Sequence, residues 1–111
     1  MDKKRLSYEI LEMQKVFPHA RLFQDHDGTL YWELKFKIYT INVFYVSGYP
    51  FVPANIYISP ALRTHHHHED LSVCWQENEW NPSWTATTVM GKAIHFISVF
   101  KSKRRRDYEI I

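Results

Sequence analysis

The chain has 111 residues, a formal net charge of +2, 45% hydrophobic residues and 16% aromatic residues. This length suits one α+β domain over residues 1–111 and excludes two separate cores. The hydrophobic content excludes a disordered chain, and the small net charge excludes a general attraction to nucleic acid. No apolar run reaches the roughly 20 residues that span a bilayer, and residues 1–5 lead into an amphipathic pattern rather than a signal peptide. We therefore expect a cytoplasmic protein that binds neither membrane nor nucleic acid.

Residues 3–17 carry the pattern of an amphipathic helix. Apolar side chains recur there at steps of four, three and four residues and define one face: Leu6, Ile10, Met13 and Phe17. The charged residues of the segment are assigned outside that face: Lys4, Glu9, Glu12 and Lys15. Pro18 disfavours continuation of the helix past Phe17.

Four antiparallel strands are predicted next, over residues 20–23, 29–37, 38–46 and 55–59. Turn residues 25–28 join the first two strands, and Gly28 can adopt a positive φ there. Residues 29–37 alternate strictly between apolar and polar types, which indicates one buried face. That face should pack against Ile10, Met13 and Phe96, and it consists of Leu30, Trp32, Leu34 and Phe36. Between the last two strands, the prolines of residues 49–53 predict a rigid connection.

Residues 60–83 show no convincing period, and a loop of this length in a small domain is typically functional. A final helix is predicted over residues 87–101, with Thr85 or Thr87 as its N-cap. Its apolar face comprises Val89, Ala93, Ile94, Phe96, Ile97 and Phe100. The basic runs at residues 3–5 and 101–106 are interpreted as solvated helix ends.

Cys74 is the only cysteine of the chain and ends a polar stretch that contains four consecutive histidines, residues 65–68. A reduced thiol beside imidazoles is a candidate nucleophile, whereas a free cysteine considered alone is more often a buried apolar side chain. In an extended stretch alternate residues share a face, so His66 and His68 would point together. His65 and His67 would point the other way.

The order of these elements resembles the ubiquitin-conjugating enzyme family. That family has an N-terminal helix, a four-stranded antiparallel meander, an active-site loop and a crossover helix. Its Tyr-Pro-x-x-Pro motif is matched by Tyr49, Pro50 and Pro53, and Cys74 falls where the family has its active-site cysteine. Trp80, Asn81 and Pro82 match the tryptophan-proline segment that follows. The resemblance covers about residues 3–101.

Two departures point to the compact bacterial members of the family, which occur in anti-phage operons. The eukaryotic His-Pro-Asn motif has no counterpart between Thr64 and Cys74. The chain also ends after one crossover helix, with a tail over residues 106–111 that is either truncated or diverged.

The resemblance implies that Cys74 accepts an acyl group as a thioester and passes it to an amine. The partners would be an activating enzyme and a ubiquitin-like protein or other protein C-terminus, and no cofactor is implied. His66 occupies the position of the family's asparagine and would donate to the oxyanion. His68 and Asp70 are further candidates for proton transfer or for orienting a histidine. Three more residues are assigned to the binding walls around the cysteine: Trp75, Trp80 and Asn81.

Two other interpretations remain. Four histidines, two acids and one cysteine are all ligand types for zinc, although consecutive histidines point alternately and no Cys-x-x-Cys is present. The chain could also be a non-catalytic adaptor of the same fold, which binds a ubiquitin-like protein or a peptide without transferring it.

Overall fold

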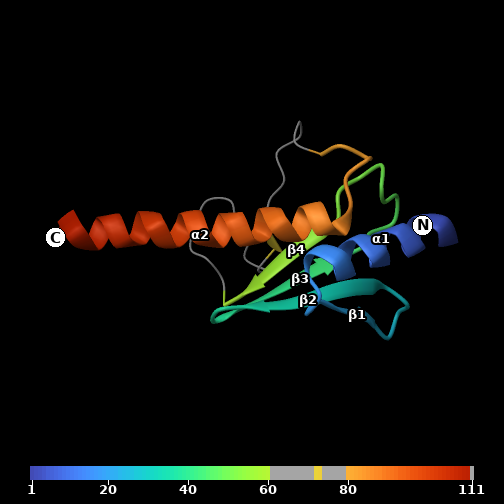
Figure 1. Cartoon of the computed structure of the whole chain (residues 1–111), viewed down its shortest axis with the longest axis horizontal. Coiled ribbons are helices and arrows are strands. Elements are labelled where there is room, and N and C mark those ends of the chain that lie inside the picture. Colours follow the sequence, from blue (N-terminus) through green and yellow to red (C-terminus); the bar gives the residue numbers. More distant parts are fainter. Residues whose placement is uncertain (61–71, 74–79, 111) are drawn as a thin grey trace.

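The computed structural model describes the backbone of residues 1–60, 72–73 and 80–110, and the side chains of residues 1–60 and 80–99. An N-terminal helix is followed by an antiparallel sheet and a C-terminal helix (Figure 1). In chain order, the elements are α1 (Lys3–Val16), β1 (Arg21–Gln24), β2 (Leu30–Phe36), β3 (Tyr39–Phe44), β4 (Asn55–Ser59), β5 (Ser72–Val73) and α2 (Ala86–Ile110).

The sheet has the spatial order β1-β2-β3-β4-β5, and each strand pairs antiparallel with its neighbour. The four predicted strands are therefore confirmed as a meander, with small differences at their ends. The predicted strand over residues 38–46 is shorter, because a tight turn at Lys37 and Ile38 joins β2 to β3. Lys37 takes a left-handed φ of 57° in that turn. The two-residue β5 was not predicted, since so short a strand has no period of its own.

Helix α1 begins after Asp2, whose side chain accepts a hydrogen bond of 2.7 Å from the backbone N–H of Arg5. This is the usual way in which an acidic N-cap satisfies a free amide of the first turn. Met13 of the predicted apolar face is fully buried. The assignment of Glu9 outside the buried part of the helix was wrong, because its side chain is 0% exposed.

Helix α2 begins at Ala86, and Thr85 occupies the N-cap position. The Thr85 carbonyl accepts from the N–H of Val89, and its own N–H donates to Thr88 Oγ1. The helix continues to Ile110, beyond the predicted end at residue 101. Its face toward the sheet is buried along Val89, Met90, Ala93 and Ile97.

Both helices cover the same face of the sheet, where the hydrophobic core lies (Figure 1). Helix α2 packs on β3 and β4 and also contacts α1. The predicted inner face of β2 is confirmed, since Trp32 and Leu34 are buried and Leu30 and Phe36 pack at the margin. Neighbouring strands complete the core with Ile41, Val43, Ile56 and Ile58.

The opposite face of the sheet carries a row of aromatic rings. Phe23 of β1 and Tyr31 of β2 stack at a centroid distance of 5.5 Å, and Tyr31 and Phe44 of β3 stack at 4.5 Å. Tyr57 of β4 meets Phe44 edge-on at 5.3 Å. Cross-strand aromatic pairs of this kind stabilise a sheet beyond the area that they bury.

Candidate functional site

The structure describes some of the predicted site residues and not others. Cys74, His66, His68, Asp70 and Trp75 lie outside them, so their predicted roles remain predictions. Trp80 and Asn81 are described. The structure thus defines the two flanks of the cysteine segment: β5, which directly precedes Cys74 in the chain, and residues 80–85, which lead into α2.

The first flank is held by the sheet. Ser72 pairs with Tyr57, and Val73 pairs with Ile56, at the β4 edge. Ile56 is itself part of the core. The residue that precedes the cysteine is therefore tied to the same strand that carries part of the core.

The second flank is held by Trp80. Its indole Nε1 donates a hydrogen bond of 2.7 Å to the backbone carbonyl of Pro50. The Trp80 ring lies 5.8 Å from the ring of Tyr49 and packs edge-on against Trp84, also at 5.8 Å. Trp80 therefore joins the segment after the cysteine to the Tyr-Pro-x-x-Pro segment, two motifs that are 30 residues apart in sequence.

Asn81 forms the turn between Trp80 and α2. Its side-chain Oδ1 accepts hydrogen bonds from the N–H of Ser83 at 2.9 Å and from the Ser83 hydroxyl at 2.8 Å. The Asn81 carbonyl accepts from the N–H of Trp84 at 2.9 Å. These contacts are those of an Asx turn, in which the side chain replaces a backbone acceptor. Asn81 thus has a structural task, and its predicted role in binding remains a prediction.

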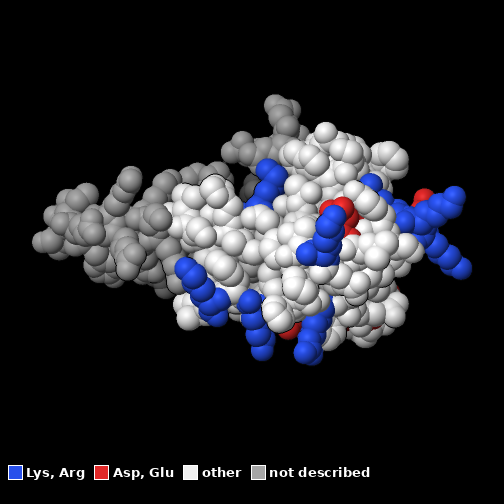
Figure 2. Space-filling view, viewed as in Figure 1, with Lys and Arg blue, Asp and Glu red and all other residues white. Residues whose placement is uncertain are grey.

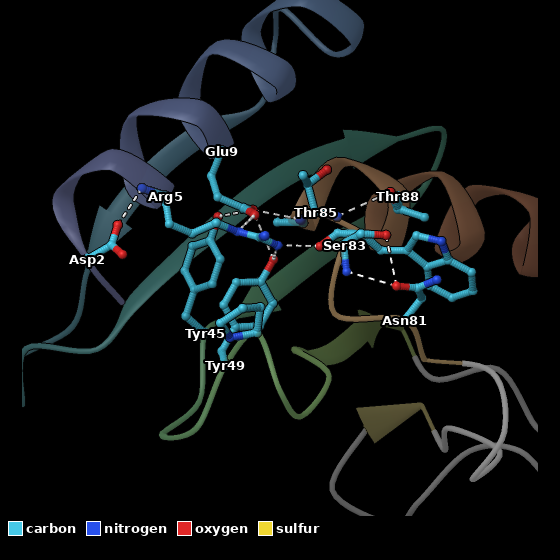
Figure 3. Close-up of polar contacts among 12 residues, drawn as sticks. Asp2, Arg5, Glu9, Tyr45, Tyr49, Asn81, Ser83, Thr85 and Thr88 are labelled. Carbon is cyan, nitrogen blue, oxygen red and sulfur yellow. Dashed lines mark hydrogen bonds and ion pairs between the residues drawn. The ribbon is translucent and has the colours of Figure 1, made fainter.

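A fully buried carboxylate, that of Glu9, lies beside the start of α2, which follows this turn (Figure 3). Oε1 accepts from the N–H of Ala86 at 2.7 Å and from the Tyr45 hydroxyl at 3.0 Å. Oε2 accepts from the Tyr49 hydroxyl at 2.8 Å and from Arg5 Nε at 3.0 Å. A buried charge is stable only when it is paired and hydrogen-bonded, and each oxygen of Glu9 has two donors.

The donors around Glu9 are themselves held in place. Tyr45 accepts a hydrogen bond of 2.8 Å from the indole Nε1 of Trp32 in the core. Arg5 also donates to the backbone carbonyl of Trp84, and its guanidinium lies 5.4 Å from the centre of the Tyr49 ring. Arg5 and Glu9 together therefore fix both the end of the Asn81 turn and the start of α2.

Burial raises the pKa of the Tyr45 hydroxyl, and the neighbouring Glu9 charge raises it further. Burial also raises the pKa of Tyr49, although the hydrogen bond from Arg5 partly opposes this. Burial lowers the pKa of Arg5, but the Tyr49 hydroxyl and the Glu9 carboxylate outweigh this effect and raise it overall. Both tyrosines therefore remain protonated donors at neutral pH, and Arg5 remains a cation. The cluster is suited to positioning rather than to proton transfer.

Arg5, Glu9 and Tyr45 were not among the functional residues predicted from the sequence. A signal was present for Glu9, since it follows Leu6 by three residues and precedes Met13 by four. That spacing places it on the apolar face of the helix. An acid on such a face must either leave the core or find buried donors.

Within the described parts of the chain, no group of three or more His, Cys, Asp or Glu side chains could hold a metal ion. The four consecutive histidines lie outside those parts. On the face shown in Figure 2, the Lys and Arg side chains of the described residues lie at several separate places, at the edges and over the centre, rather than in one patch. Among the helices of the described residues, none is long and apolar enough to cross a membrane. No protein-family model matches the chain, and no curated protein matches it either.

Proposed function

We propose that this chain is an acyl carrier of the ubiquitin-conjugating type, with Cys74 as the nucleophile. The observation that carries the proposal is the hydrogen bond between Trp80 and the Pro50 carbonyl. It joins the motif before β4 to the motif after the cysteine, the two segments on which the resemblance to that family depends. The helix–meander–helix order of the described residues also supports the proposal.

The proposed reaction has two steps. In the first, the Cys74 thiolate attacks the thioester of an activating enzyme; a new carbon–sulfur bond forms, and the activating enzyme leaves as its thiolate. In the second, an amine attacks the Cys74 thioester, a carbon–nitrogen bond forms and the Cys74 thiolate departs. The proton lost by the amine passes to a base, for which His68 and Asp70 are candidates. His66 is the candidate donor to the oxyanion.

The proposed acyl donor is a ubiquitin-like protein or another protein C-terminus, and the proposed setting is the cytoplasm of a bacterium that resists phage. The genes beside this one test that setting. A gene for an activating enzyme, for a ubiquitin-like protein or for a nucleotide cyclase supports it.

A thioester assay tests the function. The chain is produced with the activating enzyme and ubiquitin-like protein of the same operon, and its adducts are separated without thiol. A Cys74 thioester is cleaved by neutral hydroxylamine and survives a phosphine reductant, whereas a mixed disulfide shows the opposite behaviour. Cys74→Ala should abolish the adduct. Cys74→Ser should either abolish it or give an oxyester that resists neutral hydroxylamine, because an alkoxide is much harder to form than a thiolate.

The result that overturns the proposal is an unmodified Cys74 in the presence of a charged activating enzyme. If the ubiquitin-like protein still binds the chain in that case, the non-catalytic adaptor replaces the carrier. His66→Ala offers a second measurement, since it should slow transfer to the amine without loss of the fold.

A further inference from the structure

Strand β1 forms one edge of the sheet, with β2 as its only neighbour among the described strands (Figure 1). The N–H of Asp25 donates to the carbonyl of Thr29 directly opposite, at 2.7 Å. Because hydrogen-bonded pairs alternate along an antiparallel ladder, Phe23 and Arg21 also face β2. Leu22 and Gln24 therefore direct their backbone N–H and C=O groups to the free edge. Such an edge can pair with another extended strand.

The aromatic row of the outer sheet face ends at this edge. Phe23 stacks on Tyr31 on its inner side, with an interplanar angle of 23°. Its side chain is 39% exposed, and no other described ring stacks on the side of Phe23 that faces away from β2. The row thus ends on an apolar ring that is available to one more ring in the same stacking direction.

Opposite charges flank Phe23 along β1. Arg21 precedes it by two residues on β1, and Asp25, the first residue after the strand, follows it by two. Because the hydrogen bond from Asp25 to Thr29 continues the ladder by one residue, the alternation assigns all three to the outer face. Among the described residues Arg21 forms no ion pair, even though Glu33 stands across from it on β2. Among the described residues, the Asp25 carboxylate bonds only to its neighbour His26: Oδ1 accepts from the His26 backbone N–H at 2.7 Å and lies 2.7 Å from the ring Nδ1.

From these three observations we infer that the β1 edge binds a second copy of the chain, antiparallel, with a two-fold axis at Phe23. In this arrangement Leu22 of each copy exchanges both backbone hydrogen bonds with Gln24 of the other. The two Phe23 rings meet at the axis and continue the aromatic row across both sheets. Arg21 of each copy faces Asp25 of the other, so the charges are complementary at both ends.

The two-fold axis at Phe23 is favoured over its neighbours by the charges and the strand length. An axis at Leu22 sets the Phe23 ring against Arg21, and an axis at Gln24 sets it against Asp25. Only the axis at Phe23 pairs the whole of β1 and places each charge opposite its counterpart. The interface is self-complementary, as a two-fold contact requires. It does not depend on the proposed chemistry of Cys74.

A single strand pair buries less than the roughly 1,200 Å² of a standard interface, so the dimer is a weak one. Sedimentation equilibrium, with a phosphine present to exclude disulfides, should cover chain concentrations from about 10 µM to about 1 mM. The weight-average mass should rise from 13.4 kDa toward twice that value. A mass that stays at the monomer value throughout overturns the inference.

Charge variants test the register. R21D alone sets two aspartates opposite each other at both ends of the strand pair, and D25R alone sets two arginines opposite each other there. Each variant should therefore be at least tenfold weaker in self-association than the native chain. An equimolar mixture of R21D and D25R gives heterodimers in which each end pairs an aspartate of one copy with an arginine of the other, so the mixture should regain about the native affinity. The double variant R21D/D25R restores opposite charges at both ends and should associate about as well as the native chain.

Failure of the double variant to associate, while circular dichroism shows it folded, would rule out this register. Single variants that associate as tightly as the native chain would rule it out as well, because like charges would then meet without effect.

Amide exchange tests the edge itself. The amides of Leu22 and Gln24 should exchange more slowly as the concentration rises, because only the dimer bonds them. The amides of Phe23 and Asp25 are bonded within the chain and serve as the internal control. If a higher chain concentration slows amide exchange on another surface but not at Leu22 and Gln24, the inference is overturned and the chain associates through that other surface. If the exchange of the Leu22 and Gln24 amides slows only when a peptide or another protein is added, the inference is also overturned, and that partner rather than a second copy binds the β1 edge.

Discussion

The Oε1 oxygen of Glu9 accepts a hydrogen bond of 2.7 Å from the backbone N–H of Ala86, 77 residues further along the chain. Ala86 is the first residue of α2, so a carboxylate of one helix caps the other. An anion at a helix N-terminus is favoured by the helix dipole and by the free N–H groups of the first turn. This contact therefore sets where α2 begins, and with it the end of the segment that follows the cysteine.

Glu9→Ala should lower the free energy of unfolding by about 3–5 kcal/mol, because it leaves Arg5, two tyrosine hydroxyls and the Ala86 amide without their buried acceptor. Urea denaturation measures the change. Glu9→Gln is the matched variant; it keeps the shape and one acceptor oxygen, and should lose less. A Glu9→Ala protein within about 1 kcal/mol of the native stability would contradict the structural role of the cluster.

Trp80→Phe should cost about 1 kcal/mol or slightly more, since it keeps an aromatic ring but leaves the Pro50 carbonyl without the indole donor. Trp84→Phe is the control. It changes a half-buried indole of the same cluster and keeps a ring beside the Lys92 cation, without removing the donor to Pro50. Equal losses for the two variants in thermal denaturation would show that ring size, and not the hydrogen bond, determines the effect.

Two glycines should respond to alanine with opposite signs. Gly28 has a φ of +90°, a conformation that a side chain disfavours, so Gly28→Ala should destabilise the protein by about 1–2 kcal/mol. Gly91 lies within α2, and apart from the backbone of its own helix a Cβ there would meet no atom of the described residues within 4 Å. Gly91→Ala should therefore stabilise by about 0.5–1 kcal/mol through helix propensity. Chemical denaturation of both variants checks the signs, and a stabilising Gly28→Ala would refute the turn geometry.

Asp27 should contribute to a pH dependence of stability in the acid range. The Thr29 backbone N–H donates to its carboxylate at 3.0 Å, and this holds the pKa of Asp27 below its ordinary value of 3.8. A depressed pKa means stability that is present above the ordinary value and is lost as the pH falls through the folded value. Asp27→Asn should therefore be less stable than the native chain at neutral pH, and the difference should shrink in acid. An Asp27 carboxyl that titrates by NMR at or above its ordinary pKa would contradict the prediction.

Asn42→Val should stabilise the protein by about 1 kcal/mol, because the Oδ1 atom of Asn42 is buried on the central strand β3 and accepts no hydrogen bond from any described residue. Removing such an acceptor relieves a desolvation cost, and a β-branched residue suits a strand. Asn42→Ala separates the two effects, because it removes the amide without adding β-branching. A loss of stability in both variants, measured by urea denaturation, would show that the amide has a stabilising contact.

Local periodicity was enough to predict the main elements of the fold. The alternation over residues 29–37 reports directly which side chains face the core, because successive residues of a strand point to opposite sides. Trp32 and Leu34 are buried as that pattern requires. Similarly, α1 and the start of α2 follow from apolar spacing and caps. The pattern did not predict β5, because its two residues acquire strand geometry only by pairing with Ile56 and Tyr57.

The sequence by itself also marked Cys74, since a single thiol at the end of a histidine-rich stretch needs no structure to be noticed. Only the tertiary structure decided the state of Glu9, because three of its four hydrogen-bond partners lie 36, 40 and 77 residues away. It likewise decided that Trp80 binds Pro50 and that β1 is left as an open edge among the described strands. The physical reason is that periodicity records which face of an element is apolar, whereas the partner of a buried polar group depends on where distant segments meet.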